Sequence, residues 1–226
     1  MLVSCASSGT EVTNELLHSN GEEHSQLDTE IKDLNQKVSV FQIKGLGCNS
    51  LQYGTGFFVA ENIVVTNAHV VAGVNSPKII YNGDGYDLDF ISLDANSDLA
   101  ILRSEDFSHQ PLELDEAEEG EYGTVVAFVK DGKKVITEVK ILEKILAVGK
   151  DIFGQPGESR EALSLHARIE SGFSGAPILN DDFGVVGVIF SRSRGGSSTA
   201  YAVQSSEVKK ILEKEPDLSS STNCIP

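Results

Sequence analysis

From residue 38 onward the chain alternates short apolar segments with turn signals, and this alternation restricts its fold more than any other feature. The segments are rich in Val, Ile, Phe and Tyr, and breaks such as AENI, NGDG, NDDFG and SRGG separate them. About a dozen short strands at this spacing, without alternating helices, are typical of an all-β barrel or sandwich. We predict strands at 38–44, 54–60, 63–66, 77–81, 86–93, 98–103, 123–129, 134–147, 162–169, 177–180, 183–191 and 199–203.

The residues before this series are organised differently. Residues 1–22 are polar and predict a disordered tether. Residues 23–38 predict a short helix that packs on the domain or, alternatively, forms a stalk, because their apolar side chains follow a helical spacing. These side chains belong to Leu27, Ile31, Leu34 and Val38. Residues 39–226 form the predicted globular domain.

A second helical pattern lies near the C-terminus, in the segment SSEVKKILEK. Its apolar residues fall on one helical face, and Pro216 lies beyond its end. Ser205 or Ser206 is the predicted N-terminal cap, since a serine oxygen at that position can accept a hydrogen bond from a free backbone N–H group. We therefore expect a C-terminal helix after the last strand.

The charge of the chain argues against nucleic acid as a partner. Its 34 acidic and 18 basic residues give a formal net charge of −16, whereas phosphate binding depends on clusters of Lys and Arg. The densest basic run, KDGKK at 130–134, is interpreted as a hairpin tip. The acidic residues gather at 105–121, which predicts a solvated loop or, alternatively, a surface that attracts basic substrates.

The N-terminus suggests export. No run of about 18 apolar residues occurs, and the apolar region of a complete signal peptide is absent. Nevertheless, the start Leu2-Val3-Ser4-Cys5 resembles the lipobox of bacterial lipoproteins, in which the cysteine carries the lipid. We expect an extracytoplasmic protein that is secreted, periplasmic or bound to the cell surface. Lipidation of Cys5 or a missing N-terminal segment would anchor it to the membrane.

The segment ESGFSGAPIL at 170–179 contains a candidate nucleophile, Ser174. A serine hydroxyl attacks poorly unless a base takes its proton and a third group orients that base. Gly172 and Gly175 permit backbone angles that let successive N–H groups converge on one point. On its own this Gly-x-Ser-Gly-x-Pro segment also occurs in ordinary turns, so its interpretation depends on the rest of the chain.

Two residues at strand boundaries are candidates for the base and its orienting acid. His69 directly follows a β-branched strand in IVVTNAHVVAG, and strand ends are where a rigid scaffold presents side chains. Asp98 leads into the apolar strand LAILR, so its carboxylate can be half-buried and accept a hydrogen bond from imidazole. Taken singly, His69 is also compatible with a core or surface histidine, and Asp98 with a cap at the start of a strand.

Together these segments resemble the trypsin-like serine proteases, and the resemblance covers about 39–213. It implies a chymotrypsin-type fold of two perpendicular six-stranded β-barrels. It also implies a serine endopeptidase that cleaves proteins or peptides without a cofactor or metal, through a triad of His69, Asp98 and Ser174. The backbone N–H groups of Gly172 and Ser174 would form its oxyanion hole. The matching segments are GTGFFVAENIVVTNAHVV, DLAIL, GFSGAPIL, GVVGVIF and TAYAV.

Two groups within this superfamily share further features. Bacterial Deg/HtrA-type proteases share TNAHVV and DLAIL but usually carry a PDZ domain after the protease. Actinobacterial membrane-tethered periplasmic proteases linked to acid resistance carry a cysteine before the G-x-G-F strand and another at the C-terminus, joined as a disulfide. Cys48 and Cys224 occupy those places. The likeness implies a Cys48–Cys224 disulfide, an oxidising compartment and a monomer.

The chain departs from the family at two positions beside the nucleophile. Phe173 replaces a polar residue and Ala176 replaces a glycine. Without an acid at 173, the animal-type activation by a freed N-terminal amine cannot operate. The bulky side chain either leaves activity intact, since position 173 contributes its backbone, or favours a collapsed oxyanion loop in the resting state. The rival functions are a non-catalytic protease-fold binding protein and a Deg-type oligomeric quality-control protease.

The resemblance also places a substrate pocket beside Ser174. Position 168 would form its base, and that residue is Arg168. No acidic residue occurs among the predicted lining residues, so a trypsin-like preference for Lys or Arg is disfavoured. The predicted walls consist of Phe190, Ser191, Arg192 and Thr199.

Overall fold

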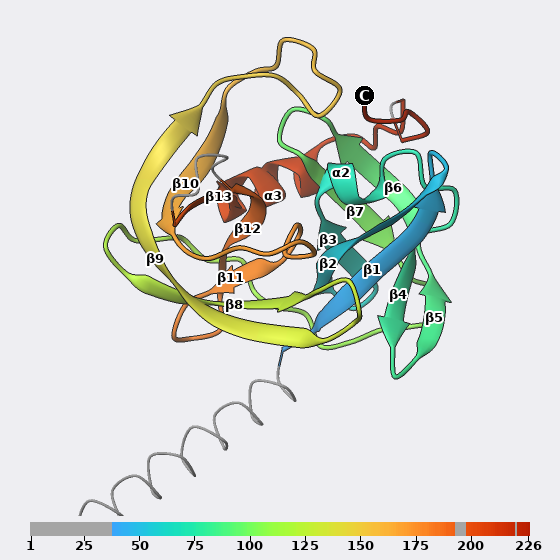
Figure 1. Cartoon of the computed structure of the whole chain (residues 1–226), viewed down its shortest axis with the longest axis horizontal. Coiled ribbons are helices and arrows are strands. Elements are labelled where there is room, and N and C mark those ends of the chain that lie inside the picture. Colours follow the sequence, from blue (N-terminus) through green and yellow to red (C-terminus); the bar gives the residue numbers. More distant parts are fainter. Residues whose placement is uncertain (1–37, 193–197, 220) are drawn as a thin grey trace, which may run out of the picture. The chain divides into compact units, whose positions relative to one another are not determined.

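The computed structural model describes residues 38–192, 198–219 and 221–226. The predicted tether, the predicted N-terminal helix and Cys5 lie outside the described residues. Residues Ser39–Pro226 form one compact unit, and Figure 1 shows its strands in two groups. The fold is mostly β with two short helices, as the sequence predicts, although the described range contains thirteen strands.

The first group of strands forms a seven-stranded sheet with the order β5-β4-β1-β2-β3-β7-β6. Neighbouring strands pair in antiparallel fashion. The short helix α2 (Ala68–Val71) follows β3. The strands are β1 (Val40–Gly47), β2 (Ser50–Ala60), β3 (Ile63–Thr66), β4 (Lys78–Tyr81), β5 (Asp84–Asp87), β6 (Asp89–Asp94) and β7 (Leu99–Arg103).

The prediction of one strand over 86–93, and of six strands in this half, is wrong. The strand is interrupted at Leu88. The side chain of Leu88 is buried, and its N–H group donates to Pro77 O at 2.9 Å. Before the break β5 pairs with β4, and after it β6 pairs with β7. One apolar run therefore supplies two strands, because the chain changes its pairing partner within that run.

The second group of strands forms a closed six-stranded barrel with the order β10-β13-β12-β11-β8-β9. The β8–β9 connection contains the predicted hairpin tip, where Gly132 has a φ of 87° and its N–H group donates to Val129 O. A closed barrel leaves no unpaired edge strand. The strands are β8 (Tyr122–Phe128), β9 (Lys134–Ala147), β10 (Arg160–His166), β11 (Pro177–Leu179), β12 (Val185–Arg192) and β13 (Thr199–Gln204).

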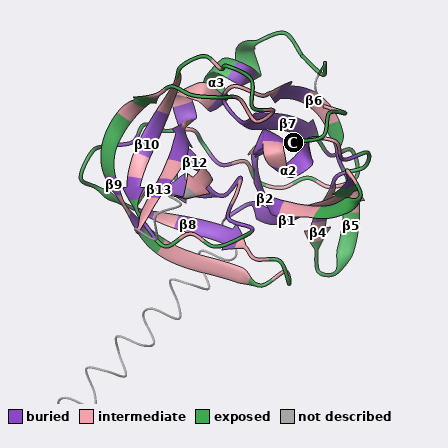
Figure 2. Cartoon of the chain, turned by 45° about the horizontal axis from the view of Figure 1, so that its top comes forward, coloured by how far each residue is buried: buried purple, intermediate pink, exposed green. Residues whose placement is uncertain are grey.

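Each group of strands encloses its own apolar core. In the first core, Phe41 packs edge to face against Phe58 and Phe107, with ring centroids 5.6 and 5.2 Å away. The second core contains Phe173 and Ile178, both fully buried. Figure 2 shows buried residues concentrated in the strands of both groups, while β5 is largely exposed. The two cores are separate, and a seam lies between them.

The C-terminal helix α3 (Ser205–Glu213) is present as predicted, but its predicted cap is wrong. The N-cap residue is Gln204, which makes no side-chain capping hydrogen bond. Ser205 Oγ instead donates to Asp115 O, and Ser206 Oγ donates to Glu161 Oε2 at 2.5 Å. Both hydroxyls therefore join the helix to the second barrel. Within the described residues, no helix combines the length and the apolar character needed to cross a membrane.

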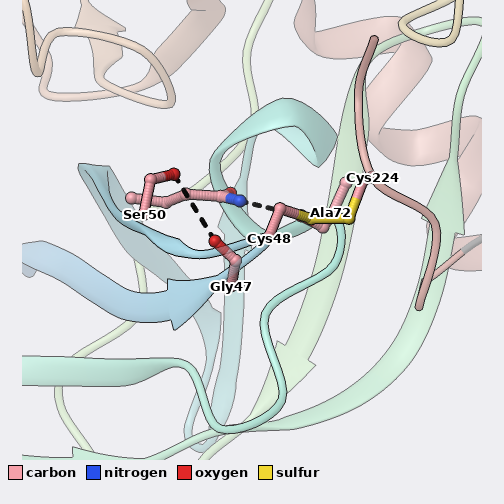
Figure 3. Close-up of a disulfide and its surroundings, with 6 residues drawn as sticks. Gly47, Cys48, Ser50, Ala72 and Cys224 are labelled. Carbon is pink, nitrogen blue, oxygen red and sulfur yellow. Dashed lines mark hydrogen bonds between the residues drawn. A yellow bond between two sulfur atoms is a disulfide. The ribbon is translucent and has the colours of Figure 1, made fainter.

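A disulfide joins Cys48, in the β1–β2 turn, to Cys224 near the C-terminus, as the family resemblance implies (Figure 3). The two cysteines are 176 positions apart, with their Cα atoms separated by 5.8 Å. Nearby, the Gly73 N–H group donates to Ser221 O at 2.8 Å. The C-terminal segment is therefore fastened beside the residues that directly follow α2.

Candidate active site

The seven-stranded sheet and α2, together called the first barrel below, bring His69 and Asp98 into direct contact. His69 is the second residue of α2, and Asp98 directly precedes β7. One carboxylate oxygen lies 2.7 Å from His69 Nδ1, and the other accepts the His69 backbone N–H group at 2.9 Å. The side chain of Asp98 is 6% exposed and that of His69 is 30% exposed. The aspartate thus fixes the orientation of an imidazole that still reaches solvent.

The backbone of Asp98 is held in an unusual conformation. Its φ is +58°, a left-handed value that costs a residue with a side chain about 1–2 kcal/mol. Its carbonyl oxygen accepts the Ala68 N–H group at 3.1 Å and Asn67 Nδ2 at 2.8 Å. Asn67 is fully buried. Sequence reasoning missed the function of Asn67, and the only signal was its place two residues before the histidine.

The charge of Asp98 controls the protonation of His69. Burial disfavours the charged imidazolium and by itself lowers the pKa of His69. The negative charge of Asp98 and its hydrogen bond to the ring act in the opposite direction, and together they outweigh burial. The pKa of His69 is therefore raised above its ordinary value. An imidazole that is stabilised as a cation is suited to accept a proton during a reaction.

The second barrel supplies Ser174, from the loop that joins β10 to β11. Gly172 and Gly175 in this loop have φ values of +104° and +84°. A Cβ at Gly172 would lie 2.3 Å from Phe128 O, and a Cβ at Gly175 would lie 2.1 Å from Thr55 O. Both positions therefore require glycine for space as well as for conformation.

The backbone N–H groups of this loop fall into two sets. The Phe173 N–H group donates to Glu170 O at 3.2 Å, and the Gly175 N–H group donates to Ile189 O at 2.9 Å. Within the part of the chain that the structure describes, the N–H groups of Gly172 and Ser174 have no hydrogen-bond acceptor. They are the two groups that the family resemblance implies as oxyanion donors.

Phe173, the unusual residue before Ser174, faces the core of the second barrel. Its side chain is 1% exposed and belongs to the apolar cluster of that barrel. The Phe173 side chain therefore anchors the loop to the core of the second barrel. Its backbone N–H group is not available to a substrate, because it donates to Glu170 O within the turn.

The Ser174 loop lies beside the start of α2. A Cβ at Gly54 would lie 2.6 Å from Val70 Cγ2 and 2.8 Å from Ser174 O. Both α2 and the Ser174 loop therefore pack closely against the backbone of Gly54. A Cβ at Gly175 would lie 3.1 Å from the Asn67 nitrogen. Among the described residues, no hydrogen bond joins the Ser174 hydroxyl to the His69 ring. Such bonds are often long before substrate binds.

The residues predicted to line a substrate pocket come from β12, β13 and the loop that follows β10. Arg168 is exposed, whereas Phe190, Ser191 and Thr199 are half-buried. The side chain of Arg192 lies outside the described residues. The Arg160 guanidinium lies over the Phe190 ring, 4.8 Å from its centroid, a contact that the sequence did not reveal.

Known proteins resemble this chain in both sequence and fold. The sequence pattern of the trypsin-like peptidase domain matches residues 54–188. The chain belongs to the trypsin-like peptidase family. Serine protease Rv3671c of Mycobacterium tuberculosis is 31% identical over 181 residues, which are 78% of this chain and 46% of that protein. A probable periplasmic DegP-like serine endoprotease of Rhizobium meliloti is 32% identical over 173 residues, 71% of this chain and 32% of its own length.

Solved structures of trypsin-like peptidases show the same fold. The active form of the Rv3671c protease matches with a TM-score of 0.78 at 29% identity, over 84% of this chain and 87% of that one. Its inactive form matches with a TM-score of 0.67 at 30% identity, over 78% and 88% of the two chains. The chain spans about half the length, or less, of the curated relatives it matches.

Proposed function

We propose that this trypsin-like peptidase is a serine endopeptidase with His69 as base, Asp98 as orienting acid and Ser174 as nucleophile. The observation that carries the proposal is that the Asp98 carboxylate accepts hydrogen bonds from both the ring and the backbone N–H group of His69. Beside them lies a loop in which two N–H groups have no acceptor among the described residues. The names of the relatives support it, because both are serine proteases. The TM-score is higher for the active form of Rv3671c than for its inactive form, which supports an oxyanion loop in the arrangement needed for catalysis.

The reaction begins when Ser174 Oγ attacks the carbonyl carbon of a peptide bond. His69 Nε2 takes the hydroxyl proton, and Asp98 stabilises the resulting imidazolium through Nδ1–H. When the tetrahedral intermediate collapses, the C–N bond breaks and His69 gives the proton to the leaving amine. Water then enters, gives a proton to His69 and attacks the acyl carbon. When the bond between that carbon and Ser174 Oγ breaks, His69 returns the proton to Oγ, which restores the enzyme.

The oxyanion of each tetrahedral intermediate would be bound by the N–H groups of Gly172 and Ser174. Neither group has an acceptor among the residues that the structure describes, so neither must break a hydrogen bond to them before the reaction. Each donor of this kind stabilises the transition state by roughly 3–4 kcal/mol. The residues in the predicted pocket, Arg168, Phe190, Ser191, Arg192 and Thr199, would select the side chain that precedes the cleaved bond, and they include no carboxylate for Lys or Arg.

The proposed substrates are proteins that are exported or belong to the cell envelope. The Cys48–Cys224 disulfide supports this location, because such bonds persist in oxidising compartments. The DegP-like relative is named as periplasmic. Lipidation of Cys5 would hold the protease at a membrane, and the proposed form is a monomer.

The test is labelling with a fluorophosphonate, which reacts with activated serines, followed by intact-mass analysis without reductant. We expect one adduct on the parent protein, located at Ser174 by peptide mapping, and none on Ser174→Ala. A parent protein that is folded and remains unlabelled would support the non-catalytic binding function instead. Light scattering on the same sample distinguishes a monomer from a Deg-type oligomer.

A further inference from the structure

Thr55 of the first barrel reaches across the seam to the oxyanion loop of the second barrel. It lies in β2 and is fully buried. Its Oγ1 donates to Gly172 O at 2.8 Å and accepts the Phe128 N–H group at 2.9 Å. The hydroxyl therefore connects two segments of the second barrel, the end of β8 and the loop that carries Ser174.

The backbone of Thr55 makes a second connection to the same loop. Its N–H group donates to Ser174 O at 2.8 Å. On the other side, its carbonyl oxygen accepts Thr66 Oγ1 at 2.7 Å, which ties it to β3. Thr55 thus makes four hydrogen bonds through its three polar groups, and in two of them it donates to the carbonyl oxygens of Gly172 and Ser174, which lie on either side of the Ser174 N–H group.

These contacts fix the peptide group that lies between the two proposed oxyanion donors. That group joins Gly172 to Phe173, and Thr55 Oγ1 holds its carbonyl end. Glu170 O holds its N–H end at 3.2 Å. A peptide group held at both ends cannot rotate without breaking a buried hydrogen bond. Within the described ranges, the flanking N–H groups of Gly172 and Ser174 have no acceptor and are available to an oxyanion.

We propose that Thr55 is a positioning residue that keeps the oxyanion loop in its reactive arrangement. The proposal rests on the catalytic function proposed for Ser174. It depends on a hydroxyl, because only a group that donates and accepts at the same time can bind Gly172 O and the Phe128 N–H group together. Serine satisfies this requirement, whereas valine has the same shape but satisfies neither partner.

The test compares Thr55→Val with Thr55→Ser and with a matched control, Gln42→Leu. Gln42 is paired with Thr55 in the β1–β2 register and is also buried. Its Nε2 donates across the seam to Val129 O at 2.8 Å, but it makes no hydrogen bond to the loop. Gln42→Leu therefore removes a buried contact between the barrels without releasing Gly172. Each variant is measured below its own melting temperature, with the rate normalised to folded protein.

The first readout is the rate of fluorophosphonate labelling, because the phosphoryl oxygen of the adduct uses the oxyanion donors. We expect Thr55→Val to label about 10–100-fold more slowly than the parent, approaching the loss of a whole donor. Thr55→Ser should remain within about threefold of the parent, since it keeps both hydrogen bonds. Gln42→Leu should melt at a lower temperature yet label at the parent rate. Labelling of folded Thr55→Val at the parent rate would overturn the proposal.

The second readout does not depend on activity. Deuterium uptake by peptides covering 170–176 should rise in Thr55→Val and remain unchanged in Gln42→Leu. If the parent is not labelled but the variants show this uptake pattern, the catalytic function is rejected. The contact between Thr55 and the loop is supported in that case. If Thr55→Val does not fold, Thr55→Ala replaces it, because it removes the hydroxyl without placing a second methyl group between Gly172 O and the Phe128 N–H group. Unchanged uptake and labelling in that variant would equally overturn the proposal.

Discussion

Asn67 Nδ2 donates a 2.8 Å hydrogen bond to the main-chain oxygen of Asp98, the residue whose carboxylate binds the His69 ring. The asparagine therefore holds the left-handed backbone of Asp98 from outside the proposed triad. Because Asn67 is fully buried, its amide is shielded from water and its contact is not easily replaced.

Replacing Asn67 by Ala should lower both stability and activity. Loss of this hydrogen bond should cost about 0.5–1.5 kcal/mol of unfolding free energy, because Asp98 O keeps the Ala68 N–H group as a donor. The less restrained Asp98 backbone should also let the carboxylate move away from the His69 ring, which slows fluorophosphonate labelling. The measurements are a thermal melt and a labelling time course at a temperature where the variant is folded.

Asn180→Ala provides the matched control for Asn67→Ala. Asn180 Nδ2 binds Asp115 Oδ2 at 2.8 Å, and its Oδ1 accepts the Gly184 N–H group in the β11–β12 turn. Its loss should lower the melting temperature without slowing the labelling of folded protein. An equal slowing in both variants would show that labelling reports general stability rather than the Asp98 backbone.

The raised pKa of His69 predicts an activity that increases with pH. The histidine acts as a base only when neutral, and its pKa in the folded protein lies above the ordinary 6.5. The acid limb of kcat/KM should therefore have its midpoint above that value. Asp98→Asn removes the charge that raises the pKa, so its midpoint should move down while kcat falls by about 10⁴. A midpoint unchanged by Asp98→Asn would contradict this coupling.

The same pKa shift contributes to stability with a defined sign. Folded His69 binds its proton more tightly than the unfolded chain does, so the contribution is fully present below the unfolded pKa. It is lost as the pH rises through the higher folded pKa. His69→Gln should therefore remove stability at acidic pH more than at alkaline pH, as read from urea unfolding at both values.

The disulfide should contribute measurably to thermal stability. It closes a loop between residues 176 positions apart, for which the chain-entropy model gives an upper figure of about 5 kcal/mol. Reduction should lower the melting temperature by several degrees, since about 1 kcal/mol corresponds to 2–4 °C in a protein of this size. The double variant Cys48→Ser/Cys224→Ser should melt at the reduced value and no longer respond to dithiothreitol. Cys5→Ser should behave like the parent.

The strands could be predicted from the sequence because their alternating β-branched and apolar residues are a local property. The break at Leu88 could not, since it depends on which strand lies alongside before and after that residue. His69 and Asp98 were recognised as strand-boundary residues, and the structure places them in contact. The proximity of Ser174 to α2 was implied only by the family resemblance.

The supporting residues of the site were missed for a physical reason. A buried threonine in a strand, such as Thr55, looks like any other β-branched residue, because its hydroxyl acquires a partner only when the second barrel packs against it. Asn67 likewise resembles a turn residue until Asp98 adopts its left-handed backbone. Polar contacts between segments far apart in the chain leave no local pattern to recognise.

Gly175 provides a test of how closely the two barrels must approach at the Ser174 loop. A Cβ there would lie 2.1 Å from Thr55 O and 2.4 Å from Thr66 Oγ1, and its φ is +84°. Gly175→Ala must therefore push the loop away from β2 and displace Ser174. We expect severe destabilisation and no fluorophosphonate adduct on any folded fraction.

Gly83→Ala separates this crowding from the conformational effect. Gly83 has a similar φ of +91°, but a Cβ there meets nothing within 4 Å. Its substitution should cost only about 1–2 kcal/mol, the general penalty of a left-handed residue, and leave labelling unchanged. If Gly175→Ala were no worse than Gly83→Ala in both melting and labelling, the loop would not be held against Thr55 as the structure shows. The difference between the two variants therefore measures the contact on which the reactive arrangement of Ser174 depends.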